Sequence, residues 1–286
     1  MSSATIGIQR RRGFKLPPYL ILLFPAVTFM LLVYAYPFVA SVVRSFIDKG
    51  GNFSFANYVK SWNLYLKDIL FTFAVTVFST VVSGVIAVLL SVYFRLHESP
   101  ISKFLLNLYR LPIFIPFVVV AQMMNSFLAP HGLLNTALAQ LKLINLNNPL
   151  QLFNFAGLSF GFVWKLAPFT ILIIYGGFQM IDNSYIEAAR SSGARWFNLI
   201  VRILIPMNKP SIMVALVLIY SQIVGTFTLP YMLIGGKIPT TITVDIAHRV
   251  NYFRDFGVAN ALGVFSYILV FVSAIYYLKT KVKEVK

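Results

Sequence analysis

The sequence predicts an all-α membrane protein whose one domain crosses the bilayer six times. Apolar residues make up 58% of the 286 residues and charged residues only 11%, whereas a soluble domain carries roughly 25% charged residues. The apolar residues also gather into six long runs, each close to the roughly 20 helical residues that cross a hydrocarbon core. This composition suits a chain that lies in lipid.

The six runs are expected to be helices, because they lack the apolar and polar alternation of a barrel strand, and within lipid only helices and closed barrels satisfy their backbone groups. We interpret the first run as a retained span, because no small-residue cleavage site follows it. The predicted domain covers residues 18–280, between a basic tail at 1–17 and a second tail at 281–286. Its spans are predicted at residues 20–41, 69–94, 104–128, 155–180, 212–234 and 258–278.

The net charge of +16 is distributed unevenly over the two sides of this topology. Fifteen basic residues fall on one side and eight on the other, so the positive-inside rule makes the first side cytoplasmic and places both termini there. Topology and attraction to anionic lipid headgroups account for the charge, so no nucleic-acid partner is expected. The cytoplasmic group is Arg10, Arg11, Arg12, Lys15, Arg95, Lys103, Arg110, Arg190, Arg195, Arg202, Lys209, Lys279, Lys281, Lys283 and Lys286.

Signatures of catalysis are missing from the sequence. Cysteine is absent, which excludes thiolate metal sites, and the three histidines have no zinc-type spacing. The run Gly235-Gly-Lys-Ile-Pro239 lacks the earlier Gly and the following hydroxyl of a phosphate loop. We therefore expect no catalytic residue, no metal site, no cofactor bound by this chain and no ATP hydrolysis by it.

A polar loop at residues 181–210 interrupts the apolar runs. Asp182, Asn183 and Ser184 are candidate N-caps of a short helix. Ala188 and Ala189 are strong helix formers that let another surface approach closely, and Gly193 permits a chain reversal. The loop is thus predicted to hold a short helix followed by a sharp turn.

The second half of the loop is amphipathic. After the turn, apolar residues recur at three- and four-residue spacing until two prolines break the helix. An ordinary amphipathic segment lying on the membrane surface would show the same pattern. The residues of this stripe are Trp196, Phe197, Ile200, Ile203 and Leu204, and the prolines are Pro206 and Pro210.

This loop resembles the cytoplasmic coupling loop of binding-protein-dependent ABC importer permeases, with Glu187-Ala-Ala189, Gly193, Ile203 and Pro206 in that family's order and separation. Further stretches resemble the carbohydrate-uptake branch of the family. Ser191 and Ser192 depart from residues that are typical of particular branches. The matching stretches are Tyr36-Pro37, Ser45-Phe46, Asn57-Tyr58, Gly132-Leu-Leu-Asn135, Trp164-Lys165, Pro168-Phe169, Gly177-Phe-Gln179 and Leu229-Pro-Tyr-Met-Leu-Ile-Gly-Gly236.

The resemblance implies the type I ABC importer permease fold in a cell (inner) membrane. It also implies partners: two cytoplasmic ATP-binding subunits that use ATP and Mg²⁺, an extracytoplasmic solute-binding protein and a second permease, for which an unlike subunit is favoured over a copy of this chain. The short helix would enter a cleft of an ATP-binding subunit, where Glu187 would pair with a basic residue. The implied coupling residues are Glu187, Ala188, Ala189, Gly193, Ala194, Ile203 and Pro206.

The predicted spans also carry candidate residues of a translocation pathway. Lys165 is the clearly embedded charge, costing about 2.5–3.5 kcal/mol on insertion scales, so it should face a wet cavity, pair with another group or snorkel. Sugars need amides, hydroxyls and aromatic faces, although polar side chains also join helices to one another. The candidates are Gln122, Asn125, Lys165, Ser221, Gln222, Thr226 and Tyr231.

The sequence leaves two alternatives to a sugar permease. A stand-alone secondary transporter commonly uses carboxylates within the membrane, but all eight acidic residues, including Asp68 and Asp245, fall in predicted loops, span edges or tails. A permease for polyamines or other small polar solutes is the nearer alternative, although a cation path should present carboxylates. We therefore expect an ABC importer permease for a carbohydrate.

Overall fold

The computed structural model describes residues 18–97 and 99–284, and apart from one β-bridge between Ile47 and Phe53 its regular elements are helices. Turns of π-helix cover Leu31–Ala35 and Ile200–Leu204, and a 3₁₀ turn covers Leu111–Phe114. The α-helices are α1 Pro18–Met30, α2 Tyr36–Ser45, α3 Ala56–Leu96, α4 Pro100–Arg110, α5 Phe117–Leu128, α6 Leu133–Gln140, α7 Phe155–Gln179, α8 Asn183–Ser191, α9 Trp196–Leu199, α10 Ile205–Met207, α11 Lys209–Gly225, α12 Thr228–Ile234, α13 Ile242–Asn251 and α14 Phe256–Glu284.

The predicted multi-pass helical architecture is confirmed. Within the described residues, five helices are long and apolar enough to cross a membrane, and a sixth is reached if two segments that meet at 68° are counted as one span. The bent pair is Trp196–Met207 with Lys209–Gly225. The five helices are Leu23–Ser45, Ala56–Leu96, Phe117–Gln140, Phe155–Gln179 and Phe256–Ile275.

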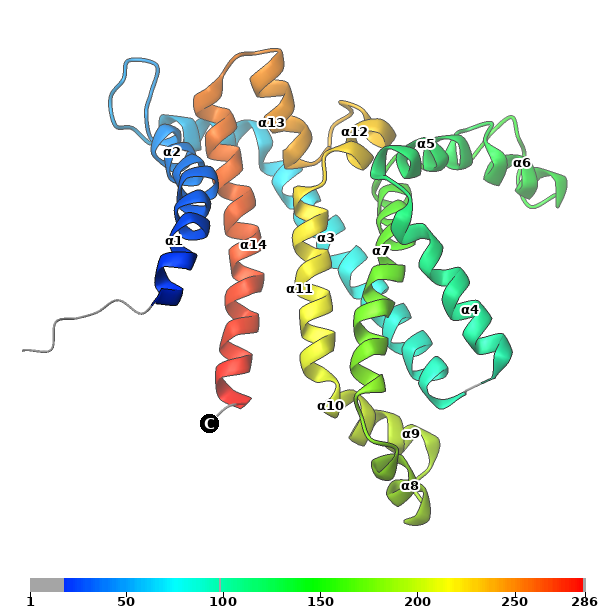
Figure 1. Ribbon diagram of the computed structural model, residues 1–286. Coiled ribbons are helices and arrows are strands. Elements are labelled where there is room, and N and C mark those ends of the chain that lie inside the picture. The colour runs from blue at the N-terminus through cyan, green and yellow to red at the C-terminus, as the bar shows by residue number, and fades with distance from the viewer. Residues whose placement is uncertain (1–17, 98, 285–286) are drawn as a thin grey trace, which may run out of the picture.

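The prediction of one continuous helix over residues 104–128 is wrong. Helix α4 ends at Arg110, and α5 begins only at Phe117. Pro112 and Pro116 lie in between, and a proline removes a backbone donor and clashes with the carbonyl four residues earlier. As a result, α4 runs along the bundle whereas α5 turns across it (Figure 1).

The predicted helix over residues 212–234 is also broken. Helix α11 ends at Gly225, Thr226 adopts an extended conformation, and α12 begins at Thr228. Glycine is a poor helix former, and Pro230 fits the first turn of a new helix but not the interior of a continuing one. The fourth predicted span, in contrast, coincides with α7 within one residue.

The second predicted span is longer than expected, because α3 begins at Ala56. Asp68 therefore lies inside a helix and is buried, with 2% of its surface exposed, and not at a span edge. Helix α3 packs on α7, α11 and α14, and many of its buried residues are small, which lets helices approach closely within a membrane. These buried residues include Thr72, Thr76, Ser79, Ser83, Ala87 and Ser91.

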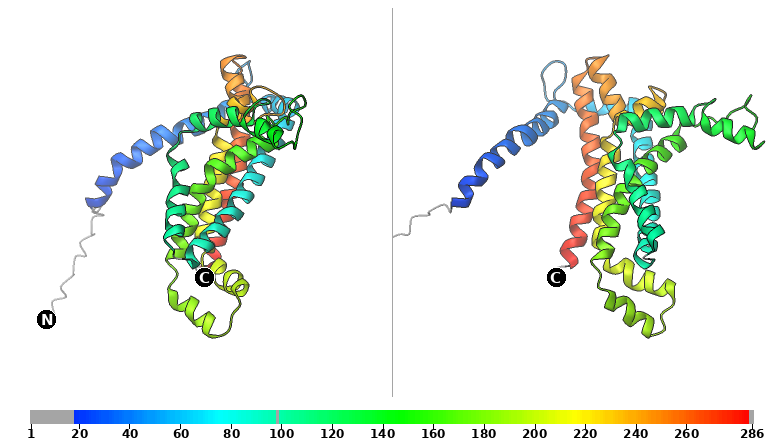
Figure 2. Two further views of the ribbon diagram at one scale, coloured as in Figure 1. Left: turned by 90° about the vertical axis from the view of Figure 1, so that its right-hand side faces the viewer. Right: turned by 45° about the vertical axis from the view of Figure 1, so that its right-hand side comes forward.

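The bundle has two distinct ends (Figure 1). We call the end where α8 and α9 project beyond the other helices the α8 end, and the opposite end, where α12 and α13 lie, the α13 end. Helix α11 packs on α3, α7 and α14, and α2 packs on α14. Figure 2 shows α1 leaning away from the bundle, and within the described residues the apolar window of the span Leu23–Ser45 is not buried.

Candidate functional site

Helix α8 is delimited by two capping motifs. At its start, the side chain of Asp182 accepts a hydrogen bond of 2.8 Å from the backbone N–H of Ser184, which holds the pKa of that carboxyl below its usual value. At its end, the N–H groups of Gly193 and Ala194 bind the carbonyls of Arg190 and Ala189. This is a Schellman motif with Gly193, at φ +76°, in the left-handed position. The predicted caps and chain reversal are present.

Among the described residues, one face of α8 is buried and the other is exposed. Ile186 and Ala189 are buried in an apolar cluster that includes Phe178, Leu199 and Leu204. Glu187 and Ala188 are exposed. Glu187 also lines a cavity of about 190 Å³ together with Arg95 and Arg190. Helix α8 projects at the α8 end (Figure 1), and its exposed residues include Glu187 beside the small Ala188.

The segment after Gly193 divides between the core and the surface. Ala194 and Ile203 pack partly buried against the same apolar cluster as α8, whereas Trp196 and Phe197 are 52% and 73% exposed. Pro206 is exposed in α10, and the break between the two predicted prolines falls at Asn208. Of the predicted coupling residues, Ala189, Ala194 and Ile203 thus pack in one apolar cluster, whereas Glu187, Ala188 and Pro206 are exposed.

Lys165 closes the break between α4 and α5. Its ammonium donates hydrogen bonds to the carbonyls of Pro112, Ile113 and Ile115 at 2.8, 3.2 and 2.5 Å. It also lies 5.3 Å from the ring centroid of Phe117. The carbonyl of Pro112 also accepts from the backbone N–H of Ile115 in the 3₁₀ turn, and the buried lysine supplies donors where the helix is interrupted. The predicted embedded charge is paired with backbone oxygens.

A cavity of about 340 Å³ opens at this break and brings together two of the predicted pathway residues, Lys165 and Gln222. Three aromatic rings belong to the same lining, which also includes Pro116. No carboxylate is among its lining residues. The cavity therefore combines an amide, aromatic faces and one positive charge that is held by dipoles and not by an acid.

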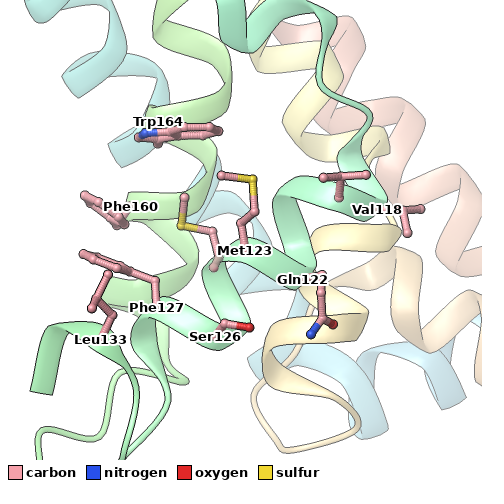
Figure 3. Close-up of a pocket in the computed structure, with 10 residues that line it drawn as sticks. Val118, Gln122, Met123, Ser126, Phe127, Leu133, Phe160 and Trp164 are labelled. Carbon is pink, nitrogen blue, oxygen red and sulfur yellow. The ribbon is translucent and has the colours of Figure 1, made fainter. Parts of the chain in front are cut away.

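A larger cavity of about 650 Å³ lies between α5, the start of α6 and α7. Figure 3 shows Phe160 and Trp164 of α7 on one side and Gln122 of α5 on the other. Phe127 stacks on Phe160 with ring centroids 6.1 Å apart. The lining is mostly apolar, and Gln122 and Ser126 add polar groups. Among the predicted pathway residues, only Gln122 lines this cavity.

The other predicted pathway residues are spread over separate environments. Asn125 donates to the carbonyl of Met232 at 3.4 Å. Ser221 donates to the carbonyl of Val217 within α11 at 2.9 Å, and Thr226, just after α11, donates to the carbonyl of Gln222 at 2.6 Å. Tyr231 stacks on Phe227 with centroids 4.9 Å apart. These groups join and cap helices, as the alternative interpretation allowed.

The sequence patterns missed the groups that surround Lys165 and Gln122. The carbonyls of residues 112–115 became acceptors only because the span is broken, and the pair Pro112 and Pro116 was the signal for that break. Trp164 and Phe160 face the larger cavity, but within an apolar run they could not be told from lipid-facing rings.

The fold and this site define a class: a multi-pass, all-helical membrane protein with a capped polar helix projecting from one end. Residues 83–283 match a family described as "Binding-protein-dependent transport system inner membrane component". The chain belongs to this family. The resemblance inferred from the loop at residues 181–210 is thus confirmed.

The chain is similar to several permease proteins. It is 35% identical over 135 residues to the sulfoquinovosyl glycerol transport system permease protein of Agrobacterium fabrum, which covers 46% of this chain and 44% of that protein. It is 33% identical over 116 residues to the spermidine/putrescine transport system permease protein of Haemophilus influenzae, covering 40% of each. The chain thus matches less than half the length of these curated relatives.

A solved structure extends the likeness to nearly the whole fold. A bacterial alginate ABC transporter, in complex with an alginate pentasaccharide-bound periplasmic protein, contains a chain that matches with a TM-score of 0.78 at 20% identity. The match covers 91% of this chain and 92% of that one. It supports the architecture described above.

Proposed function

We propose that this chain is the membrane permease subunit of an ATP-driven, binding-protein-dependent ABC importer. Its family membership supports this assignment, and one structural observation carries it: α8 projects from the bundle with Glu187 and Ala188 exposed. A helix that is capped at both ends and anchored along one face moves as a unit. It is suited to transmit the motion of an ATP-binding subunit.

The proposal places the α8 end in the cytoplasm of a cell (inner) membrane. The positive-inside distribution supports this orientation, and α14 runs toward the α8 end (Figure 1). The α13 end then faces a solute-binding protein. Two ATP-binding subunits, which use ATP and Mg²⁺, and a second permease complete the assembly, with this chain forming half of the pathway.

We favour a carbohydrate or oligosaccharide as cargo. The 340 and 650 Å³ cavities offer amides, a hydroxyl and aromatic faces, which suit a sugar, and no carboxylate is among their lining residues. Lys165 adds a positive charge that would repel a polyamine. The relative that is named for a sugar derivative also has the longer match and the higher identity. A polyamine remains the alternative because of the second relative.

Coupling is tested by Glu187→Ala in the complete transporter, reconstituted in vesicles with its ATP-binding subunits and solute-binding protein. Loss of a coupling contact should lower both solute uptake and solute-stimulated ATP hydrolysis at least about fivefold. Ser191→Ala, another exposed position on α8, is the matched control and should leave both rates unchanged. Wild-type rates for Glu187→Ala would contradict the proposed role.

The cargo is tested on the solute-binding protein that stimulates the transporter. A thermal-shift screen with neutral sugars, acidic sugars and polyamines should show stabilisation by a carbohydrate. Stabilisation by spermidine or putrescine alone would overturn the sugar assignment and leave the importer assignment standing.

A further inference from the structure

Helix α3 is the longest uninterrupted element in the part of the chain that the structure describes. Its 41 residues, Ala56–Leu96, contain no proline, and they give a length of about 60 Å at 1.5 Å per residue. In Figure 1 it runs from the α13 end of the bundle down to the start of α4. Sharp bends in helices arise at prolines or local defects, so α3 is expected to move as one stiff body.

At the α8 end, Arg95 ties α3 to the turn between α7 and α8. Its guanidinium donates to the carbonyls of Phe178 and Ile181 at 3.0 and 2.8 Å, and to the side-chain oxygen of Asn183 at 2.5 Å. Phe178 lies in the last turn of α7, Ile181 follows that helix, and Asn183 is the first residue of α8. A planar guanidinium with several fixed donors holds such a turn more rigidly than an ammonium can.

A column of rings adds a second connection beyond Gly193. Tyr93 stacks on His97 with centroids 4.7 Å apart, and His97 stacks on Trp196 at 6.1 Å. The guanidinium of Arg190 lies 4.8 Å from the centroid of Trp196. The C-terminal end of α3 therefore contacts the unit formed by α8 and α9 on both sides of its turn.

At the α13 end, the same helix holds the segment that leads into α13. The side chain of Asp68 accepts a hydrogen bond of 2.7 Å from the backbone N–H of Thr240, and the hydroxyl of Thr72 accepts one of 3.0 Å from Ile242. All four groups are buried. Lys60 and Asp255 form an ion pair at 2.6 Å beyond α13.

Two neighbouring routes are interrupted. Helix α4 is separated from α5 by the break that Lys165 spans, and α11 ends at the break before α12. Helix α7 is continuous but contains Pro168. Within the described residues, α3 joins α8 to the segment before α13 through one proline-free helix, with part-buried contacts of Arg95 at one end and buried contacts of Asp68 and Thr72 toward the other.

We propose that α3 carries displacement of α8 to the segment around α13, with Arg95, Asp68 and Thr72 as the positioning residues. This inference rests on the proposed importer function and names the route by which docking at the α13 end and ATP hydrolysis at the α8 end influence each other. Asp68 and Thr72 lie far along α3 from α8, so an effect of these residues on ATP hydrolysis is not expected from local contact with an ATP-binding subunit.

The test uses the complete reconstituted transporter and measures the ratio of ATP hydrolysis with and without loaded solute-binding protein. Thr72→Val removes the acceptor for Ile242 while keeping the side-chain volume, and the ratio should fall at least about fivefold. Thr76→Val is the matched control, because Thr76 is equally buried one turn further along α3 and its hydroxyl has no hydrogen-bond partner. It should keep the wild-type ratio.

Arg95→Gln should lower the ratio to the same extent, and combining it with Thr72→Val should cause little further loss, because both interrupt one route. Arg95→Lys keeps the charge but not the planar guanidinium. Its ratio should therefore lie between those of Arg95→Gln and the wild type. A Thr72→Val variant that assembles and keeps the wild-type ratio would overturn the inference, as would an equal loss in Thr76→Val. Lack of stimulation in the wild-type transporter would contradict the proposed function instead.

A direct measurement keeps the inference testable if a variant assembles poorly. The chain has no cysteine, so spin labels at Tyr252→Cys and Leu141→Cys, both exposed positions, report the distance between α13 and the end of α6. ATP binding should change this distance in the otherwise wild-type transporter and leave it unchanged with Arg95→Gln. The same change in both would refute the route through α3.

Discussion

Lys165 shows how a charge becomes tolerable inside an apolar bundle. A lone ammonium at this depth is costly, but here it donates hydrogen bonds to three backbone carbonyls at the break between α4 and α5. The carbonyls at the break stabilise the buried ammonium, and the ammonium in turn satisfies these carbonyls. Removing the lysine would leave buried acceptors unsatisfied, which costs about 1–3 kcal/mol for a single group.

Lys165→Met should therefore destabilise the protein by about 1–3 kcal/mol and lower uptake by disturbing the 340 Å³ cavity. The measurement is thermal unfolding in detergent together with uptake in vesicles. Lys103→Met, at an exposed position in α4, is the control and should unfold at the wild-type temperature. Equal stability of the two variants would show that the carbonyls find other donors.

Asp245 gives the protein a predictable dependence on pH. Burial raises its pKa to about 8, the negative charge of Asp68 adds to the increase, and Arg249 opposes it. Its carboxyl binds a proton in the folded state that it releases when unfolded, so stability falls as pH rises from about 4 to about 8. Each pH unit in the upper part of this range should remove on the order of 1 kcal/mol.

Asp245→Asn mimics the protonated form and should flatten the decline in melting temperature between pH 5 and pH 8. Melting curves of wild type and variant at one-unit intervals measure this difference. Parallel curves would mean that Asp245 already ionises normally in the folded protein. Asp48→Asn, which changes a partly exposed carboxylate that accepts from the N–H groups of Gly50 and Asn52 in the loop after α2, controls for the loss of an acidic side chain.

At the scale of elements, the crossing of α7 and α11 depends on a missing side chain. A Cβ at Gly177 would lie 2.0 Å from the side-chain oxygen of Asn208 and 2.2 Å from the hydroxyl of Ser211. Asn208 is buried, and it donates to the carbonyl of Ile174 at 2.8 Å. Asn208 lies at the bend between α10 and α11. We therefore expect this contact to influence the position of α8 and α9 relative to the bundle.

Gly177→Ala should cost about 1–3 kcal/mol of stability, because the side chain must displace Asn208. Gly176→Ala is the matched control in the same helix: its Cβ would meet nothing within 4 Å, so the variant should gain up to about 1 kcal/mol from helix propensity. Melting temperatures in detergent distinguish the two. Similar shifts for both would show that the crossing relaxes without strain.

The two ends of α8 illustrate what local sequence can predict at this scale. Asp182 and Gly193 act through hydrogen bonds to groups within a few residues, so their roles as cap and turn could be predicted. The buried face formed by Ile186 and Ala189 could not, because it depends on Phe178 and Leu204, which other elements supply.

At the scale of the whole molecule, orientation follows from charge. The larger group of basic residues lies in the predicted cytoplasmic segments, so the C-terminus is expected in the cytoplasm. A reporter enzyme that works only in the cytoplasm should therefore be active when it is fused after Lys286, and one that works only outside should be inactive. Paired reporters that work on opposite sides of the membrane measure this directly. A matched fusion within the loop at residues 47–55, on the opposite side of the predicted topology, should give the reverse pattern. An extracytoplasmic signal after Lys286 would overturn the proposed orientation.

The sequence by itself determined the helical membrane class, the family and the capped polar helix, because hydrophobic length, composition and short-range hydrogen bonds are properties of contiguous residues. The tertiary structure decided which predicted spans break, what pairs with Lys165 and how α3 connects the two ends. Those outcomes depend on groups brought together from distant positions, such as Lys165 with the carbonyls near Pro112 or Asp68 with Thr240. No local pattern specifies such contacts, since packing selects the partners.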